Sequence, residues 1–164
     1  MLSKAMQDAL NDQIKSEFYA SYLYLSMSAY FDAANYPGFA QWMRMQSQEE
    51  YEHALKIFNY INDRDGKVVL KAIDQPSADF KSSTDAFTQA LEHERKVTGM
   101  VNKLYEMAMK ENDYPTQVML HWFISEQVEE EKTALGIVDQ LKIIGDAPAA
   151  MIMLDRQLGE RSKG

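Results

Sequence analysis

Six polar side chains that can bind a metal or donate a hydrogen bond stand where helical periodicity predicts a hydrophobic core. They come from four separate segments of the chain, and five of them are good metal ligands: Glu17, Glu50, His53, Glu94, Gln127 and Glu130. The other inward-facing positions of each segment are mostly apolar or small, and none is Lys or Arg. An unpaired buried carboxylate is costly or takes up a proton. The pattern therefore predicts divalent cations as the partners of these acids.

The spacing of these residues gives them a common orientation. Glu50 and His53 are three positions apart and share one face of a helix. Gln127 and Glu130 have the same spacing. Carboxylate oxygens with a single imidazole suit Fe(II) and Mn(II), and Zn(II) could also bind. Because two of the acids could bridge, and one ion would not need so many ligands, we predict a pair of metal ions.

Gly and Pro are scarce and lie at boundaries, which divides the chain into long helices. We predict four helices, at about residues 4–34, 39–65, 83–111 and 115–144, and a short fifth helix at about 149–158. Gly66 is expected to be the left-handed residue that ends the second helix. Ser83 or Thr84 is expected to cap the third. The sequence thus predicts an all-α protein with a single domain over residues 1–164 and a bundle over residues 4–144.

Residues 67–82 lack helical periodicity and include a β-prone piece at 68–70. This connector of about 16 residues can stretch about 50 Å, enough to run along helices of about 28 residues, which are about 42 Å long. Glu50 and Glu94 each lie 11 residues after the expected start of their helix, so they are level only if both helices start at the same end. We therefore predict one long crossover between the second and third helices. The other two loops of the bundle are short and join antiparallel neighbours.

Composition limits the classes of partner and location. The chain has 164 residues, no Cys and a net charge of −8, which disfavours nucleic acid as a partner and favours cations. No apolar run approaches the roughly 20 residues that span a bilayer, and residues 1–10 lack the apolar stretch of a signal peptide. We expect a cytoplasmic protein with no nucleic-acid and no membrane partner.

Over essentially its whole length the chain resembles the ferritin family, most closely the non-haem bacterial ferritins. The resemblance rests on Glu17, the run Glu49-Glu50-x-x-His53, Glu94, and the run Ser125-Glu126-Gln127-Val128-Glu129-Glu130-Glu131. Gln127-x-x-Glu130 looks like ferritin and unlike bacterioferritin or rubrerythrin, which carry Glu-x-x-His. No haem is predicted, because Tyr51 stands beside Glu50 where bacterioferritins would place a haem-binding Met. The implied fold is a ferritin-like four-helix bundle with a short fifth helix.

The resemblance assigns the predicted ligands to two neighbouring iron ions. The first would be held by Glu17, Glu50 and His53. The second would be held by Glu50, Glu94 and Glu130, with Glu50 bridging. By the same resemblance the chain would oxidise Fe(II) with O₂ or H₂O₂. The Fe(III) would then be stored in a hollow homo-oligomeric cage of twenty-four subunits, with the apolar residues 147–154 buried against symmetry mates.

Further residues are assigned around this iron pair. Gln127 would lie beside the second iron as a ligand or as a hydrogen-bond donor. Tyr24 is expected close to the pair, with a part in the oxygen chemistry. A third iron site would share Glu130 and add three more carboxylates, those of Glu49, Glu126 and Glu129.

Two other functions stay open from the residues alone. The same carboxylates could serve a di-iron oxygenase or oxidase that acts on an organic substrate. A purely structural helical bundle could also carry an incidental acidic core. Aerobic addition of Fe(II) followed by sizing separates the three, because only a storage protein keeps far more iron soluble than its own ligands can bind.

Overall fold

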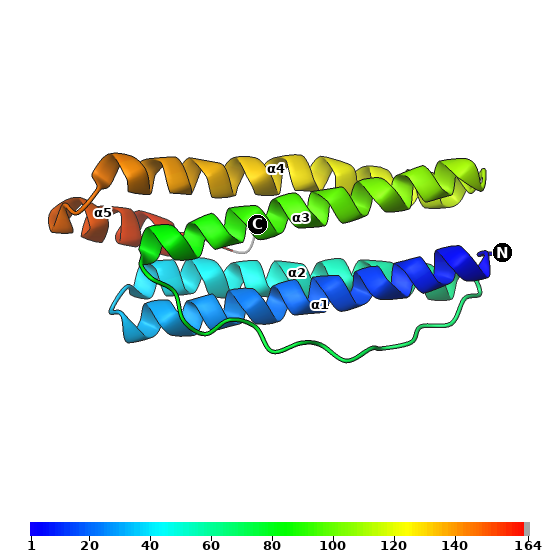
Figure 1. The fold of residues 1–164 in the computed structure, drawn as a ribbon, viewed down its shortest axis with the longest axis horizontal. Helices are drawn as coiled ribbons and strands as arrows, with labels where there is room; N and C mark the ends of the chain where they lie inside the picture. Colours follow the sequence, from blue (N-terminus) through cyan, green and yellow to red (C-terminus); the bar gives the residue numbers. More distant parts are fainter. Residues whose placement is uncertain (163–164) are drawn as a thin grey trace.

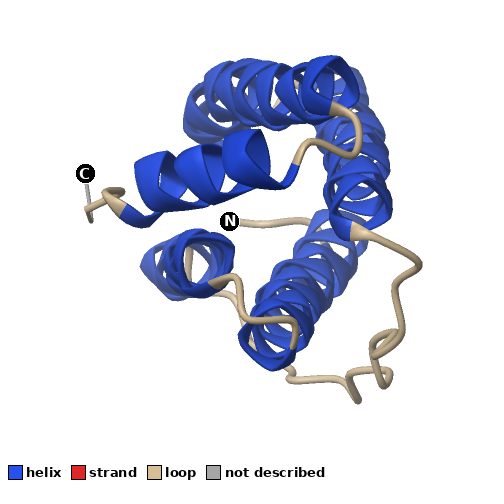
Figure 2. Ribbon diagram, turned by 90° about the vertical axis from the view of Figure 1, so that its left-hand side faces the viewer, coloured by secondary structure: helices blue, strands red, loops and turns tan. Residues whose placement is uncertain are grey.

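The computed structural model describes residues 1–162, which form five α-helices joined by loops (Figure 1). The helices are α1 (Lys4–Ala33), α2 (Pro37–Asp63), α3 (Ser83–Lys110), α4 (Tyr114–Ile144) and α5 (Pro148–Gly159). The first four lie side by side along the long axis, and α5 packs mainly against α2 at one end of the bundle (Figures 1 and 2). Within the described residues there is no β-strand. The predicted all-α four-helix bundle with a short fifth helix is confirmed.

The segment between α2 and α3 runs the length of the bundle beside α1, as the long crossover requires (Figure 1). Asn11 holds its first part by two hydrogen bonds: Nδ2 donates to the Lys67 carbonyl at 3.0 Å, and Oδ1 accepts from the Val69 amide at 2.9 Å. Farther along, the Ser26 hydroxyl donates to the Ser77 carbonyl at 2.6 Å. The β-prone piece is extended but forms no strand. The crossover makes α2 and α3 start at the same end, which brings Glu50 and Glu94 level.

Three helices of the bundle end with a left-handed residue, and the residue is Asn or Asp each time. Asn35, Asp65 and Asn112 have φ values of 62°, 56° and 55°. The prediction that Gly66 takes this role at the end of α2 is wrong, because Asp65 tolerates the left-handed conformation and comes one residue earlier. Gly66 is instead required by space. A Cβ atom there would lie 2.9 Å from Cγ2 of Ile61.

Helices α1, α3 and α4 begin with capping side chains that satisfy a free amide of the first turn. The capping residues are Ser3, Ser82 and Asp113, each of which accepts a hydrogen bond from the amide three residues on. The cap of α3 was expected at Ser83 or Thr84 and lies at Ser82 instead. Ser82 has the extended backbone that a capping residue needs, with φ −166° and ψ 171°.

Helix α2 has no capping side chain of its own and receives one from α5. The Phe39 amide donates to Oδ1 of the buried Asp155 at 2.8 Å. The two helices approach so closely that a Cβ atom on Gly38 would lie 1.7 Å from the Asp155 carbonyl oxygen. A Cβ atom on Gly159 would lie 2.9 Å from Cα of Gly38. Helix α5 is therefore seated on the first turn of α2 by contacts that larger residues would block.

The apolar core consists of two clusters separated by a polar layer. One cluster lies toward α5 and includes Phe39 and Phe87, whose ring centroids are 5.6 Å apart. The other lies toward the opposite end and includes Ile57 and Val101. Each of the four long helices passes from one cluster to the other through buried polar residues. None of the helices in residues 1–162 is long and apolar enough to cross a membrane.

Candidate metal centre

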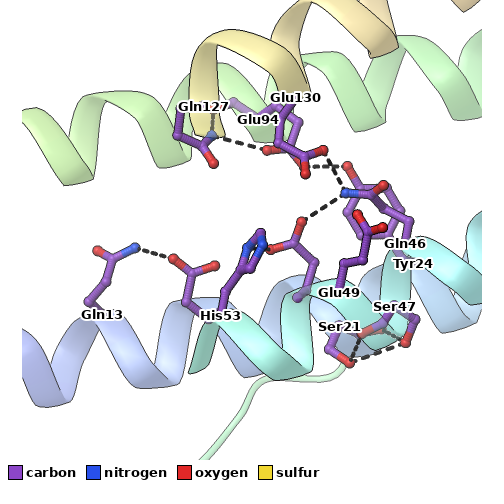
Figure 3. A network of polar contacts seen from close by, with 12 residues as sticks. Gln13, Ser21, Tyr24, Gln46, Ser47, Glu49, His53, Glu94, Gln127 and Glu130 are labelled. Atoms are coloured by element: carbon purple, nitrogen blue, oxygen red, sulfur yellow. Dashed lines mark hydrogen bonds and ion pairs between the residues drawn. The ribbon is translucent and has the colours of Figure 1, made fainter. Parts of the chain in front are cut away.

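The polar layer between the two apolar clusters contains a carboxylate cluster, by which we mean Glu17, Glu50, His53, Glu94 and Glu130. Helix α2 supplies two of these residues and α1, α3 and α4 supply one each, and all five are buried. Their side chains point toward one another across the bundle, as Figure 3 shows for His53, Glu94 and Glu130. Four helices that are distant in sequence thus meet at one level, where the inward-facing positions of each become polar.

The ligand atoms of the cluster form two overlapping groups. One atom each from Glu17, Glu50 and His53 lies within 4.8 Å of the others, and the same holds for Glu50, Glu94 and Glu130. Glu50 belongs to both groups. The chemistry of these donors, carboxylate oxygens with one imidazole, fits two neighbouring divalent ions that share the Glu50 carboxylate. These are the same residues that the sequence pattern and the resemblance selected.

Amide side chains, and not Lys or Arg, hold several of the acids. In the described chain no Lys or Arg forms an ion pair with any carboxylate of the cluster. Gln13 Nε2 donates to Oε1 of Glu17 at 2.8 Å. Gln46 Nε2 donates to Glu50 at 3.0 Å and to Glu130 at 2.7 Å. Sequence analysis did not assign roles to Gln13 or Gln46. Each lies one helical turn before a ligand, a spacing that could have identified them.

Among the fully buried carboxylate oxygens of the cluster, one has no hydrogen-bond partner in residues 1–162. It is Oε2 of Glu17, which is buried. Buried polar atoms in folded proteins are nearly always paired, so an orphaned carboxylate oxygen calls for an explanation. A cation bound between Glu17, Glu50 and His53 would supply the missing partner.

Burial and mutual repulsion raise the pKa values of these carboxyl groups. Burial, and then the charge of Glu50, raise the pKa of Glu17 well above its ordinary value. Burial and the charge of Glu94 do the same to the pKa of Glu50. The pKa of Glu130 rises to about 8, first through burial and then through the charge of Glu94. Ions of charge +2 would favour the ionised carboxylates and displace their protons.

Glu94 is held by two neutral hydrogen-bond donors. The Tyr24 hydroxyl donates to Oε1 of Glu94, and Gln127 Nε2 donates to Oε2 at 3.1 Å (Figure 3). The structure therefore makes Gln127 a hydrogen-bond donor to Glu94. Burial, and then the negative charge of Glu94, raise the pKa of Tyr24 well above its ordinary value. Tyr24 is thus a protonated phenol that touches one ligand carboxylate.

His53 lies between a carboxylate and two aromatic rings. Its Nδ1 is 3.1 Å from Oε2 of Glu50. Its ring meets those of Trp122 and Phe123 nearly edge-on, with centroids 5.3 Å and 6.1 Å away. The Lys56 ammonium lies 4.1 Å from the Trp122 ring centroid. Sequence analysis missed Trp122, because nothing in the pattern shows which aromatic ring orients the imidazole.

The residues expected at a third site are only partly brought together. Glu126 joins His53 and Glu130 in a third group whose ligand atoms lie within 4.8 Å of one another. A cavity of about 460 Å³ adjoins this group, and both His53 and Glu126 line it. Glu129 is exposed and belongs to none of the groups found among the described residues. Glu49 lines the same cavity and also forms an ion pair with Arg161.

The two other histidines lie away from the cluster. His93 faces a groove between α1 and α3, where its ring meets that of Tyr19 with centroids 5.8 Å apart. Burial, and then the charge of Lys96, lower the pKa of His93 to about 4. His121 is exposed and lies 3.1 Å from the Tyr105 hydroxyl. Neither belongs to a metal-binding group in the described part of the chain.

Comparisons with known proteins place the chain close to one family over nearly its whole length. Residues 7–144 match the family model of the ferritin-like domain. The bacterial non-heme ferritin of Bacteroides fragilis (strain 638R) is 44% identical over 161 residues, which cover 98% of this chain and 100% of that protein. The corresponding protein of Staphylococcus haemolyticus (strain JCSC1435) is 42% identical over 162 residues, which cover 99% of this chain and 98% of that protein.

Solved structures show the same likeness. An open-pore ferritin from the hyperthermophilic archaeon Archaeoglobus fulgidus superposes with a TM-score of 0.98 at 45% identity, covering 99% of this chain and 100% of that chain. An engineered closed form of the Archaeoglobus fulgidus ferritin superposes with a TM-score of 0.99, also at 45% identity, and the two chains cover each other fully.

Proposed function

The chain belongs to the ferritin family, and from this premise we propose that it stores iron. It oxidises Fe(II) at the carboxylate cluster and keeps Fe(III) as a ferric mineral inside a hollow homo-oligomer. One observation carries the proposal. Two groups of oxygen and nitrogen ligands share Glu50 in a buried polar layer where no Lys or Arg of residues 1–162 forms an ion pair with a ligand carboxylate. Nothing in the comparisons supports the alternative, a di-iron oxygenase or oxidase acting on an organic substrate.

Iron enters this scheme as the substrate. Glu17, Glu50 and His53 bind the first Fe(II), and Glu50, Glu94 and Glu130 bind the second. The two ions each give up one electron. O₂ accepts the two electrons and two protons and becomes H₂O₂, or H₂O₂ accepts them and becomes two waters.

The cluster favours oxidation through its charge. Coulomb attraction to buried carboxylates grows with the charge of the ion, so the cluster stabilises Fe(III) more than Fe(II). The protons that the raised pKa values hold on these carboxyl groups leave when iron binds. Tyr24 holds Glu94 in position by its hydroxyl and lies close enough to the pair to take part in the oxygen chemistry. Gln127 positions the same carboxylate through its amide.

A third iron site lies beside the pair. Glu126 and Glu130 form its centre, since their carboxylates share one group with His53. Glu49 supplies a further carboxylate at the wall of the same cavity. The role of Glu129 as a ligand stays a prediction, supported only by its place in the motif.

Copies of the chain form the store. Helix α5 leaves Ile152 and Met153 exposed by 50% and 72%, an apolar surface that contacts between copies would cover. A cage of twenty-four subunits and a cytoplasmic location stay predictions from the resemblance and the composition.

Aerobic addition of Fe(II) to the assembled protein, followed by size-exclusion chromatography with iron analysis, tests the proposed function. A store keeps iron soluble and co-eluting with the protein at many ions per chain. Retention of only about the two or three ions that the ligands can bind would favour the oxygenase. Retention of no iron would favour the structural helical bundle.

A further inference from the structure

Arg161 of the C-terminal segment reaches the rim of the metal centre. It follows α5 by two residues, and its Nη2 lies 2.8 Å from Oε2 of Glu49 on α2. The guanidinium is fixed by two further contacts with Trp42. Nη1 donates to the Trp42 carbonyl at 3.3 Å, and the guanidinium carbon lies 4.6 Å from the centroid of the indole ring. The two charged side chains are only 19% and 21% exposed, so this pair is anchored more firmly than a typical surface ion pair.

The Glu49 carboxylate can pair with either of two cations, the Arg161 guanidinium or the proposed third ion. On one side it accepts the guanidinium of Arg161. On the other it lines the cavity that His53 and Glu126 also line, and its charge adds to those that act on Glu130. Figure 3 shows its carboxylate beside Gln46, at the edge of the polar network.

We propose that Arg161 is a latch on the third iron site: its guanidinium holds the Glu49 carboxylate, and a third ion must displace the guanidinium before Glu49 can bind it. The inference rests on the proposed function and extends it to the control of one site. A guanidinium at 2.8 Å from the ligand oxygen repels a divalent ion that approaches the same atom. The guanidinium and the third ion therefore compete for Oε2 of Glu49.

The position of the latch is set by the seating of α5. Asp155 and the close contact between Gly38 and Gly159 fix α5 on the first turn of α2. Arg161 begins where that helix ends, and its amide donates to the Leu158 carbonyl at 3.2 Å. Arg161 acts through Glu49 and is a positioning residue. It weakens the third site relative to the pair, so that iron leaves the third site more readily.

The test uses full-length, assembled protein and Zn(II), which binds oxygen and nitrogen ligands without redox chemistry. Calorimetry gives the number of bound ions per chain and their affinities. In Arg161→Gln the third Zn(II) should bind about fivefold more tightly, the size expected from loss of a partly exposed ion pair. Arg161→Lys, which keeps the charge, should restore most of the wild-type affinity. Arg44→Gln, the same charge change at an exposed residue of α2 that pairs with Asp32, serves as the control.

A second readout follows the latch itself. Trp42 and Trp122 are the only two tryptophans of the chain, so the difference between wild type and Trp42→Phe isolates the emission of Trp42 and leaves Trp122 in place beside His53. The Trp42 emission should change as the third Zn(II) binds and the guanidinium leaves the ring. The change should vanish in Arg161→Gln. In a Glu49→Gln background, Arg161→Gln should have no further effect on the third ion, because both variants remove the same contact.

The outcomes separate the latch from the proposed function. Equal third-ion affinity in wild type and Arg161→Gln, or a Trp42 signal that does not depend on Arg161, overturns the latch. Binding of only two ions per chain in both proteins also overturns the latch, while the assignment of the two-ion centre stands. If no ion binds at micromolar affinity in either protein, the metal centre fails, and the proposed function fails with it.

Discussion

At the residue scale, the carboxylate cluster costs the metal-free protein stability. Glu50 is buried among acids and accepts a hydrogen bond from only one amide side chain, that of Gln46. Glu50→Gln keeps the volume and removes the charge, so it should leave the metal-free fold intact or more stable by about 1 kcal/mol. Because the shared ligand is lost, rapid Fe(II) oxidation should slow by at least about tenfold. Stopped-flow oxidation traces and thermal melts measure both effects.

The control for this variant is Glu92→Gln, which removes an exposed acid from α3. It should change neither the melt nor the trace. His53→Ala should abolish rapid oxidation as well, since the cluster has only one imidazole. Wild-type oxidation speed in Glu50→Gln or His53→Ala would refute the assignment of the pair.

The raised pKa values predict that metal binding releases protons. Glu130 has a pKa of about 8 in the folded protein against 4.5 ordinarily. Between these values the folded, metal-free protein holds a proton that the unfolded chain has lost, so its stability falls as pH rises through this range. A bound ion expels that proton. At pH 7, Zn(II) binding should therefore release protons, and its affinity should rise with pH up to about 8.

Calorimetry of Zn(II) binding in buffers of different ionisation enthalpy measures the number of protons released. A heat of binding that is the same in all buffers would contradict the prediction. Glu130→Gln should release fewer protons than wild type under the same conditions.

The sequence predicts the ligands well and their neighbours poorly, for a physical reason. Glu17 and Glu94 interrupt an apolar periodicity, so the chain itself marks them as buried and in need of a cation. Arg161 and Trp122 lie on faces where a charge or an aromatic ring is ordinary. Their roles depend on which helix packs against which, and that packing is a property of the assembled bundle.

At the element scale, α5 completes α2. Asp155 is the only side chain in the described residues that caps the first turn of α2, where it accepts from the Phe39 amide. Asp155→Ala should lower the free energy of unfolding by about 1–2 kcal/mol, the usual cost of a lost N-cap. Asp155→Asn retains the acceptor oxygen and should recover most of this. Chemical denaturation measures the loss. Equal stability of Asp155→Ala and wild type would show that α5 does not support α2.

A polar network ties the end of α2 to the start of α4. Arg64 Nη1 donates to Oδ1 of Asp113 at 2.9 Å, and the Thr116 hydroxyl donates to Oδ2 at 2.6 Å. Burial alone would raise the pKa of Asp113, but the hydrogen bonds from Thr116 and Arg64 outweigh it and lower the pKa below 3.8. The stability that this carboxylate contributes is therefore present above pH 3.8 and is lost as pH falls through the lower folded value.

Asp113→Asn should consequently lower the free energy of unfolding by about 1 kcal/mol at pH 7. The difference from wild type should shrink below pH 3.8, where Asp113 begins to take up a proton in the unfolded chain. Denaturant melts at several pH values measure it. A difference that stays constant down to pH 2 would refute the role of the ionised carboxylate.

The sequence predicts that a helix is present more surely than it predicts the residues at which the helix begins and ends. Pro115 and the Asn-rich turns mark the boundaries to within a few residues, because Pro and left-handed residues cannot continue a helix. Asp65 takes the left-handed conformation at the end of α2, and the contact with Ile61 then requires glycine at position 66. Such contacts arise only when the turn packs.

At the scale of the whole molecule, one surface of the subunit is too apolar to face water. Residues 147–154 begin α5, and only part of this apolar run is used inside the subunit. Leu154 is buried, whereas Ile152 and Met153 are exposed by 50% and 72%. Ile143 of α4 is exposed by 85%, and it lines a cavity of about 560 Å³ together with Met153. Contiguous exposed apolar surface of this kind marks a contact with another chain.

Assembly should depend on this apolar surface. A closed oligomer would bury it between copies, so sedimentation velocity at micromolar concentration should show one large species. Met153→Glu places a charge in the contact and should release smaller species of unchanged helical content. Thr133→Glu adds the same charge at an exposed residue of α4 that does not line the cavity, and it should not. Met153→Glu should also retain less iron while its first oxidation event keeps its speed, because the metal centre lies within one subunit. If wild-type protein sedimented only as a monomer or dimer, neither the cage nor the storage role would stand, and an enzyme with an organic substrate would become the better reading of the same ligands.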